Sequence, residues 1–288
     1  MSVSIVVPTY LRPLDLEELF DSILIQTIKP SEVIVVDDTP GDAIELVCRK
    51  YGELFNKFGI NLIYARNPGQ PSAAASRNIG VKLARGELIM FLDSDVVIFP
   101  DYIEKITDVF KKYPHALGVQ GWIVNVIGKK FHTPLQIFYG MFFLEHYTRN
   151  SCRLWEYPIM LSGIINCKRL SGANMTFKRC IFNEFQFDEN LKRYSYMEDV
   201  LLSHLIFKKY PNSLFMTPYA RCIHKRSESG RMKGKEFEKF KNQYRKYVLT
   251  KLFGVKGTFI YFWQSIGIML VNLKARIASL KNKNRSAL

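Results

Sequence analysis

The sequence predicts an α/β fold with a mostly parallel central sheet and helices on both of its faces. Two observations support this prediction. Over about the first 130 residues, short apolar runs alternate with longer amphipathic stretches, which is the pattern of parallel strands connected by covering helices. Polar residues also directly follow three of the apolar runs, where a parallel sheet presents its carboxyl edge to a ligand.

The individual helices and strands are predicted from the spacing of hydrophobic residues in each segment and from the residues that flank it. The expected strands cover residues 2–8, 32–37, 61–65, 88–92 and 117–126. The expected helices between them cover residues 14–26, 42–57, 72–84 and 101–112, the last beginning just after Pro100. An aromatic, irregular segment at 132–170 is expected to be an inserted loop-and-helix region that lines a site. A further strand at 174–177 and a short helix at 199–209 are expected beyond it.

The composition indicates a globular chain. Its 288 residues are 48% hydrophobic and 14% aromatic, which is enough to bury a large core. The five cysteines are odd in number and far apart, which argues against a disulfide framework and a zinc cluster and fits a reducing cytosol. The chain enters its first apolar run almost at once, without a basic segment before it, so no secretion signal is expected.

The formal net charge of +15 is concentrated at the C-terminal end. Residues 233–288 contain 13 Lys or Arg but only two acidic residues, Glu236 and Glu238. The basic character therefore belongs to an appendage, and we expect no nucleic-acid partner for the body of the chain.

The polar residues at the expected strand ends suggest a site. The first strand ends in Pro8, Thr9 and Tyr10, the second in Asp37 and Asp38, and the fourth in Asp93, Ser94 and Asp95. Two carboxylates at a sheet edge can hold a hard cation, Mg²⁺ or Mn²⁺, and such a cation neutralises the charge that develops on a leaving diphosphate. Two carboxylates fill only part of its coordination shell, so phosphate oxygens, water or another side chain must complete it.

Six short motifs occur in an order that makes the resemblance to a known family specific. They are VVPTY at 6–10, VVDD at 35–38, SRNIG at 76–80, FLDSD at 91–95, GANM at 172–175 and ED at 198–199. Over residues 2–225 the chain resembles the inverting glycosyltransferase family 2, whose members have the GT-A fold. The resemblance implies a metal-dependent enzyme that moves a sugar from a nucleotide diphosphate donor to an acceptor with inversion.

The resemblance also implies donor-binding residues. Asp38 would hydrogen-bond the nucleotide base, Asp93 would contact ribose, and Arg77 would lie near the nucleotide. The remaining expected donor-binding residues are Pro8, Thr9, Tyr10, Ser94, Asn174 and, in a mobile cationic loop that folds over the diphosphate, Arg226 and Arg231. Purely structural roles remain open for this set: Asp37 and Asp38 as turn residues, Arg77 as a capping or salt-bridging residue, Asn174 in a turn, and the cationic loop as a solvated surface.

Two further positions are expected to contribute to catalysis. Glu198 and Asp199 precede an apolar run, where either could simply be a favourable charge at a helix N-terminus. By resemblance, Asp199 is the general base that an inverting transfer to a hydroxyl requires, and Glu198 orients the acceptor. Some members of the family complete the metal shell with a downstream histidine, so His224 is expected to join Asp95 as a metal ligand, although a structural histidine remains possible.

The C-terminal segment has the features of a membrane-associating appendage. Phe237, Phe240, Tyr244, Tyr247, Val248 and Leu252 recur at helical spacing. The 17 residues of 257–273 carry no charge, and this length is at the lower limit for a spanning helix. Tyr261, Gln264, Ser265, Ile268 and Asn272 fall on one mostly polar stripe, which favours a helix lying in the interface over one that spans the bilayer or packs on the body.

These expectations divide the chain into a GT-A catalytic domain at 1–232 and a basic tail at 233–288. The catalytic domain would contain a nucleotide-binding half at about 1–126 and an acceptor half at about 127–232. Flanking lysines would attract anionic lipid, which places the expected enzyme peripherally or monotopically on the cytoplasmic side of the membrane, with a lipid-linked glycan as acceptor.

Three alternative functions differ in the sequence features that they require. A polyprenyl-phosphate glycosyltransferase would use an acceptor that is already ionised and needs no base. A non-catalytic, membrane-associated sugar-binding or scaffold protein would be expected to have broken motifs, and here they are intact. A sugar nucleotidyltransferase is disfavoured because residues 8–13 contain no glycine.

Overall fold

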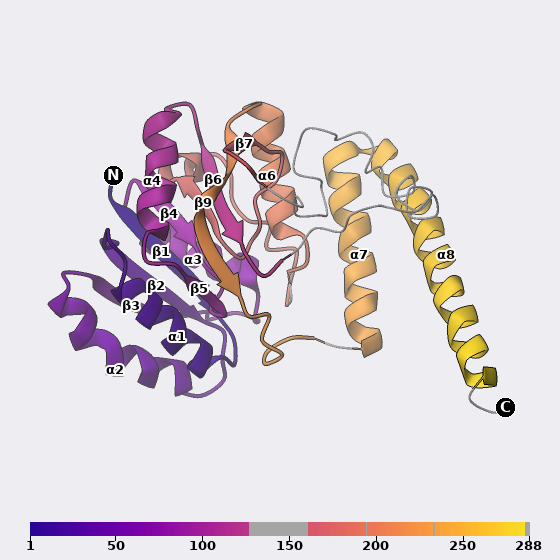
Figure 1. Ribbon diagram of the computed structural model, residues 1–288, viewed down its shortest axis with the longest axis horizontal. Coiled ribbons are helices and arrows are strands. Elements are labelled where there is room, and N and C mark those ends of the chain that lie inside the picture. The colour runs from indigo at the N-terminus through magenta and orange to yellow at the C-terminus, as the bar shows by residue number, and fades with distance from the viewer. Residues whose placement is uncertain (127–160, 194, 233, 286–288) are drawn as a thin grey trace.

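The protein is built around a nine-stranded mixed sheet (Figure 1). The computed structural model describes residues 1–126, 161–193, 195–232 and 234–285, with side chains described up to residue 270. Four neighbouring strands are mutually parallel, in the spatial order β3, β2, β1, β4. They are β1 (Val3–Thr9), β2 (Glu32–Asp37), β3 (Asn61–Arg66) and β4 (Leu88–Phe91), close to the bounds expected from sequence.

Beyond β4 the sheet is mixed, which departs from the mostly parallel expectation. β8 pairs antiparallel with β4 and β6, β6 pairs parallel with β9, and β5 and β7 pair antiparallel with β9. The bounds are β5 (Val96–Ile98), β6 (Gly118–Ile123), β7 (Ile165–Asn166), β8 (Met175–Lys178) and β9 (Leu214–His224). The strand–helix alternation of residues 1–112 predicts parallel pairing, because such pairing needs a crossover connection. This prediction is confirmed for β1 to β4, whereas the pairings beyond β4 combine one parallel pair, β6 with β9, with antiparallel ones.

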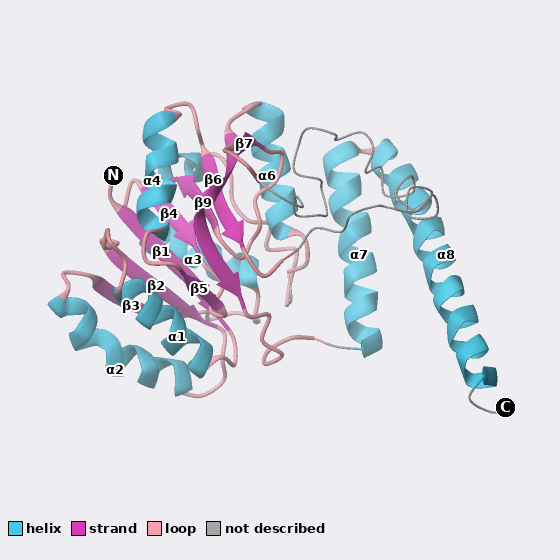
Figure 2. Ribbon diagram, viewed as in Figure 1, coloured by secondary structure: helices cyan, strands magenta, loops and turns pink. Residues whose placement is uncertain are grey.

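Helices cover both faces of the sheet, as expected (Figure 2). Ile5 and Val7 of β1 point into one hydrophobic cluster, whereas Val6 points into another on the opposite face. The first cluster is covered by α1 (Pro13–Leu24), α2 (Ala43–Lys57) and α4 (Tyr102–Lys112). The second is covered by α3 (Ala73–Leu83), the short 3₁₀ helix η2 (Arg179–Asn183) and α6 (Glu198–Lys209). Of the expected loop-and-helix region at 132–170, residues 132–160 lie outside the described residues.

The C-terminal residues form a helical hairpin beside α6 (Figure 1). Its helices are α7 (Gly234–Phe253) and α8 (Val255–Arg285), joined at Gly254, whose φ of +59° suits a glycine. Val248 of α7 is buried with Val200 and Leu201 of α6. This packing makes α7 part of the folded body.

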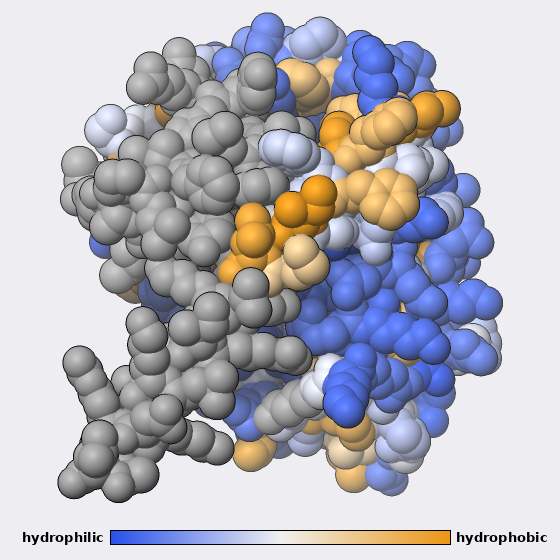
Figure 3. Space-filling view, turned by 90° about the vertical axis from the view of Figure 1, so that its right-hand side faces the viewer, coloured by the Kyte–Doolittle hydropathy of each residue, from blue (hydrophilic) through white to orange (hydrophobic). Residues whose placement is uncertain are grey.

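Two residues of the polar stripe expected on α8, Gln264 and Ser265, face the protein. Gln264 is buried, and Ser265 Oγ accepts a 3.0 Å hydrogen bond from Arg245 of α7. The opposite side of the helix exposes six large apolar residues: Val255, Phe259, Phe262, Trp263, Ile266 and Met269. Figure 3 views this end of the molecule and shows apolar residues beside a hydrophilic surface. No helix among the described residues has the length and hydrophobicity needed to cross a membrane.

Candidate active site

A cavity of about 830 Å³ opens at the carboxyl ends of β1, β2 and β4, where the sequence predicts a site. The N-terminus of α6 and the segment after β9 complete its wall. Most of the expected site residues line it: Pro8, Thr9, Tyr10, Asp38, Arg77, Asp93, Ser94, Glu198, Asp199, His224 and Arg231.

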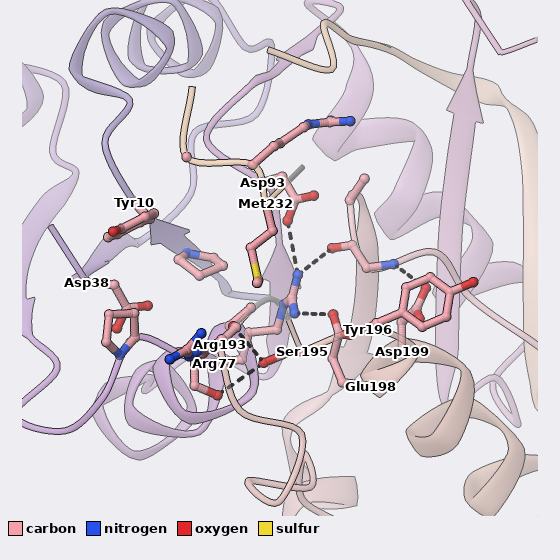
Figure 4. Close-up of a pocket in the computed structure, with 18 of the residues that line it drawn as sticks. Tyr10, Asp38, Arg77, Asp93, Arg193, Ser195, Tyr196, Glu198, Asp199 and Met232 are labelled. Carbon is pink, nitrogen blue, oxygen red and sulfur yellow. Dashed lines mark hydrogen bonds and ion pairs between the residues drawn. The ribbon is translucent and has the colours of Figure 1, made fainter. Parts of the chain in front are cut away.

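Asp37 and Asp38 have different surroundings. Asp37 is fully buried, and its Oδ1 accepts the backbone N–H of Thr39 at 2.7 Å, so it shapes the turn after β2. Asp38 lines the cavity and accepts hydrogen bonds from Asn67 Nδ2 at 2.6 Å and Ser76 Oγ at 2.7 Å. Burial raises the pKa of Asp38, and these two donors oppose the shift. Tyr10 lies near Asp38 at this end of the cavity (Figure 4).

Asp93, Asp95 and His224 form a cluster that can hold a cation. One potential ligand atom from each lies within 4.8 Å of the others. Asp95 is fully buried, and no donor among the described residues is aligned for a hydrogen bond to its Oδ1. A buried carboxylate beside a second carboxylate and an imidazole suits Mn²⁺ or Mg²⁺.

The charge of Asp95 is compensated by its neighbours. Burial raises its pKa, but contacts with His224 Nε2 at 3.3 Å and Arg12 Nη1 at 2.9 Å, with the backbone N–H of Ser227, lower it to about 2. Arg231 Nη2 approaches the other carboxylate oxygen at 3.6 Å. Asp95 therefore carries a full negative charge at neutral pH.

Arg77 bridges the two groups of carboxylates in the cavity. It is 2% exposed and donates from Nη2 to Asp93 Oδ1 at 3.0 Å and from Nη1 to Glu198 Oε1 at 2.6 Å (Figure 4). Gly80 allows this placement, because a Cβ there would lie 2.2 Å from Val6 Cγ1 and push α3 away from β1. The guanidinium is thus engaged by protein carboxylates on both sides.

The two carboxylates at the start of α6 are held differently. Burial raises the pKa of Glu198 to about 8 against the opposing effect of Arg77, and the nearby Asp199 adds to the rise. Asp199 Oδ2 accepts the Gly172 N–H at 3.0 Å and Arg169 Nη2 at 3.2 Å. Its Oδ1 accepts the N–H of Val200 at 2.8 Å, so the whole carboxylate is fixed in orientation.

The turn that leads into α6 is strained. Arg193, Ser195 and Met197 all have positive φ, between 46° and 73°, which non-glycine residues rarely adopt. Ser195 Oγ donates to Leu191 O at 2.6 Å and accepts the N–H of Ala74 at 3.2 Å, which ties the turn to the start of α3. The conformation positions Tyr196, Glu198 and Asp199 on the cavity wall.

Two expected donor-binding residues do not line the cavity. Asn174 is fully buried and donates to Gly121 O at 3.0 Å and Cys222 Sγ at 3.3 Å, contacts that tie β6 and β9 to the turn before β8. Arg226 is exposed, has a φ of +57° and is not among the residues that line the cavity. The structural alternative therefore fits Asn174.

Several cavity residues were not anticipated. Arg12, Arg169, Arg193, Ser195 and Tyr196 all line the cavity. Arg12 comes two residues after the Pro8 to Tyr10 motif, so proximity to that motif could have identified it. Arg169 lies in the segment at 132–170 that the sequence predicts to line a site, although the residue itself was not singled out. Arg193, Ser195 and Tyr196 lie in a segment without a recognisable period, and the sequence offered no comparable signal for them.

The sequence was compared with protein families and with characterised proteins, and it matches glycosyltransferases. The profile of the family described as "Glycosyl transferase family 2" matches residues 4–185. A glucosyl-dolichyl phosphate glucuronosyltransferase of Haloferax volcanii is 27% identical over 187 residues, covering 64% of this chain and 55% of the relative. The minor teichoic acid biosynthesis protein GgaB of Bacillus subtilis is 32% identical over 120 residues, covering 40% of this chain and 13% of the relative. The matches thus span about half or less of these relatives' own lengths.

Solved structures share the architecture at low sequence identity. Staphylococcus aureus TarS 1-349 in complex with UDP-GlcNAc has a TM-score of 0.58 and 18% identity, covering 88% of this chain and 67% of that one. GalNAc-T7 with UDP, GalNAc and Mn²⁺ has a TM-score of 0.59 and 16% identity, covering 78% of this chain and 44% of that one. These likenesses support the fold, and the profile match supports the family. The resemblance drawn from the six motifs is confirmed: the chain belongs to glycosyl transferase family 2 and is a glycosyltransferase of the GT-A fold.

Proposed function

We propose that the protein transfers a sugar from a nucleotide diphosphate donor to an acceptor, with inversion and with the help of a divalent cation. One observation carries this proposal: the Asp93, Asp95 and His224 cluster and the Glu198 and Asp199 pair line or adjoin one cavity, and Arg77 joins the two. Such a transfer requires a cation site that stabilises the charge on the leaving diphosphate and a base that removes the proton of the acceptor.

The donor would bind with its base near Asp38 and Tyr10. Pro8 and Thr9 would wall this end, and Asp93 and Ser94 would contact the ribose. Arg231 lies where it could meet a diphosphate, since it lines the cavity beside Asp95. TarS in complex with UDP-GlcNAc supports a nucleotide-sugar donor, by likeness of fold alone.

Asp95 and His224 would hold the cation, with Asp93 beside them. When bound, Mn²⁺ or Mg²⁺ supplies positive charge that stabilises the departing nucleoside diphosphate. The buried Oδ1 of Asp95 and its 3.3 Å separation from His224 Nε2 support this assignment. Arg12 and Arg231 add to the positive potential around the same carboxylate.

Asp199 would be the general base, and Glu198 would orient the acceptor. The three donors on Asp199 fix its carboxylate on the cavity wall, where it can accept the proton of an acceptor hydroxyl. Glu198 is tied to Arg77 through one oxygen, which leaves it suited to a directional contact with the acceptor.

The acceptor is proposed to be lipid-linked, at the cytoplasmic face of a membrane. The exposed apolar side of α8 and the lysines of α7 support peripheral attachment, with residues 1–232 as the catalytic domain and 233–288 as the attaching hairpin. Because α7 packs on α6, a tail deletion should begin at α8. A relative named for action on glucosyl-dolichyl phosphate supports a lipid-linked acceptor.

A donor panel tests the proposed function. Purified protein is incubated with nucleotide sugars and lipid-linked acceptors, with Mn²⁺ or with chelator, and the anomeric configuration of the product is read by NMR. We expect cation-dependent transfer with inversion. Retention of configuration would contradict the proposal. Full activity of Asp199→Asn on a polyprenyl phosphate would assign that acceptor, because an ionised phosphate needs no base.

A further inference from the structure

Arg12 connects the cation cluster to the segment at 225–232. Its Nη1 lies 2.9 Å from Asp95 Oδ1. Its other two nitrogens donate to backbone carbonyls of that segment: Nε to Ser229 O at 2.8 Å and Nη2 to Ser227 O at 3.1 Å. A single guanidinium therefore holds a buried carboxylate and a loop more than 200 residues away in sequence.

The segment at 225–232 forms one wall of the cavity. Gly230, Arg231 and Met232 line it. Gly230 packs closely on the backbone of Tyr10, since a Cβ added there would lie 2.5 Å from Tyr10 O. The segment is also held by Ser227, which donates from its backbone N–H to Asp95 Oδ2 at 3.0 Å and from Oγ to Asp15 at 2.8 Å. Lys225 Nζ adds ion pairs with Asp15 at 2.7 Å and Glu18 at 2.8 Å.

Arg12 and a bound cation would compete for the same oxygen. Oδ1 of Asp95 faces both Arg12 Nη1 at 2.9 Å and His224 Nε2 at 3.3 Å. A divalent ion between Asp95 and His224 would lie a few ångströms from the guanidinium. Like charges at such a separation in a largely buried site repel strongly, because little water screens them.

We propose that Arg12 is a positioning residue that couples cation binding to the placement of the 225–232 segment. Arg12 leaves Asp95 when a cation binds there, and it then loses its hold on the carbonyls of Ser227 and Ser229. With these two hydrogen bonds lost, the part of the segment that contains Arg231 can shift towards the nucleoside diphosphate. This inference rests on the cation site of the proposed function.

The first test measures the affinity for Mn²⁺ alone by electron paramagnetic resonance. Arg12→Gln removes the competing charge, and we expect it to bind Mn²⁺ about tenfold more tightly than the unaltered protein. Arg221→Gln is the matched control, because Arg221 is exposed, stacks over Phe99 and lies outside the cavity lining. Equal or weaker Mn²⁺ binding by Arg12→Gln would overturn the inference, since a merely structural role would lower the affinity or leave it unchanged.

The second test follows amide hydrogen exchange in residues 225–232. We expect Mn²⁺ to raise exchange in the unaltered protein, and Arg12→Gln to show high exchange with or without the ion. Arg12→Lys keeps the charge but cannot hold both carbonyls, so it should show high exchange with near-normal Mn²⁺ affinity. Exchange that does not respond to Mn²⁺ in the unaltered protein would overturn the coupling.

The experiments distinguish an error in the cation site from an error in the role of Arg12. If the cation site is wrong, Mn²⁺ binding to the unaltered protein will be absent or insensitive to Asp95→Asn. If only the role of Arg12 is wrong, binding will depend on Asp95 but will not tighten in Arg12→Gln.

Discussion

Arg77 donates a 2.6 Å hydrogen bond to Glu198, although the two residues are 121 positions apart in the chain. The same guanidinium bonds Asp93, so it connects the strand-end carboxylate on the donor side with the helix-start carboxylate on the acceptor side. Since Arg77 is 2% exposed, its charge is balanced almost entirely by protein groups. Arg77 therefore holds both carboxylates in position, and its contact with the nucleotide stays a prediction.

Removing Arg77 should destabilise the fold as well as the site. In Arg77→Gln, Asp93 loses its buried counter-charge and Glu198 loses the hydrogen bond from the guanidinium, and we expect a loss of about 3 to 5 kcal/mol in the free energy of unfolding. Urea denaturation at neutral pH measures this. Arg179→Gln, an exposed position on η2, is the control and should change stability by less than about 0.5 kcal/mol. Equal effects of the two variants would mean that the contacts of Arg77 with Glu198 and Asp93 contribute little to the free energy of unfolding.

Glu198 should make stability depend on pH. Its pKa is raised from 4.5 to about 8, so the folded state keeps a proton that the unfolded state releases in this range. The stabilisation is complete below about pH 4.5 and is lost as the pH rises towards 8. Relative to Glu198→Gln, the unaltered protein should lose stability on the order of a few kcal/mol between pH 5 and 8. A difference between the two proteins that does not vary with pH would refute the raised pKa.

Asp199→Asn should lose turnover and keep its affinity for donor. A missing base acts on the transition state, so we expect kcat to fall by about 10²- to 10⁴-fold while nucleotide affinity changes less than about twofold. Single-turnover kinetics with a hydroxyl acceptor and calorimetry with donor separate these effects. Glu184→Gln, a surface substitution outside the cavity lining, serves as the control. Near-normal turnover in Asp199→Asn would move the role to Glu198 or remove it.

The apolar side of α8 should determine membrane attachment. Phe259 and Phe262 are 71% and 57% exposed, so changing both to serine removes little packing. We expect binding to anionic vesicles to fall by at least about tenfold, given roughly 1.5 to 3 kcal/mol for each buried aromatic side chain. Co-sedimentation measures the bound fraction, and Leu46→Ser on α2, 53% exposed, is the control. Unchanged binding would assign α8 another partner and weaken the case for a lipid-linked acceptor.

Much of the first half of the fold could be predicted because its signals are local. Strands β1, β2 and β4 are continuous buried runs that end in polar residues, so both the strands and the edge where ligands bind are visible in sequence. Strand β9 (Leu214–His224) is not among the strands expected from the sequence. Pro218 interrupts its pattern, and the structure accommodates this with a register shift opposite Gln120 and Trp122.

The contacts within the site could not be predicted, because they join distant segments. Arg12 reaches Ser227 and Ser229, and Arg77 reaches Glu198. No period or spacing in a single sequence encodes such pairs. The partner of the polar stripe on α8 could not be predicted for the same reason: Arg245 of α7 donates to Ser265 of α8.

The most direct test of the account is the effect of Mn²⁺ on nucleotide affinity. Calorimetry would use the nucleoside diphosphate that gives the largest thermal shift, with the unaltered protein, Asp95→Asn and His224→Gln. We expect Mn²⁺ to raise the affinity of the unaltered protein by at least about tenfold, to have no effect in Asp95→Asn and to have a reduced effect in His224→Gln. Affinity without metal should stay within about threefold in all three proteins, which shows that the pocket is intact. An undiminished Mn²⁺ effect in Asp95→Asn would contradict the assignment of this cluster as the cation site.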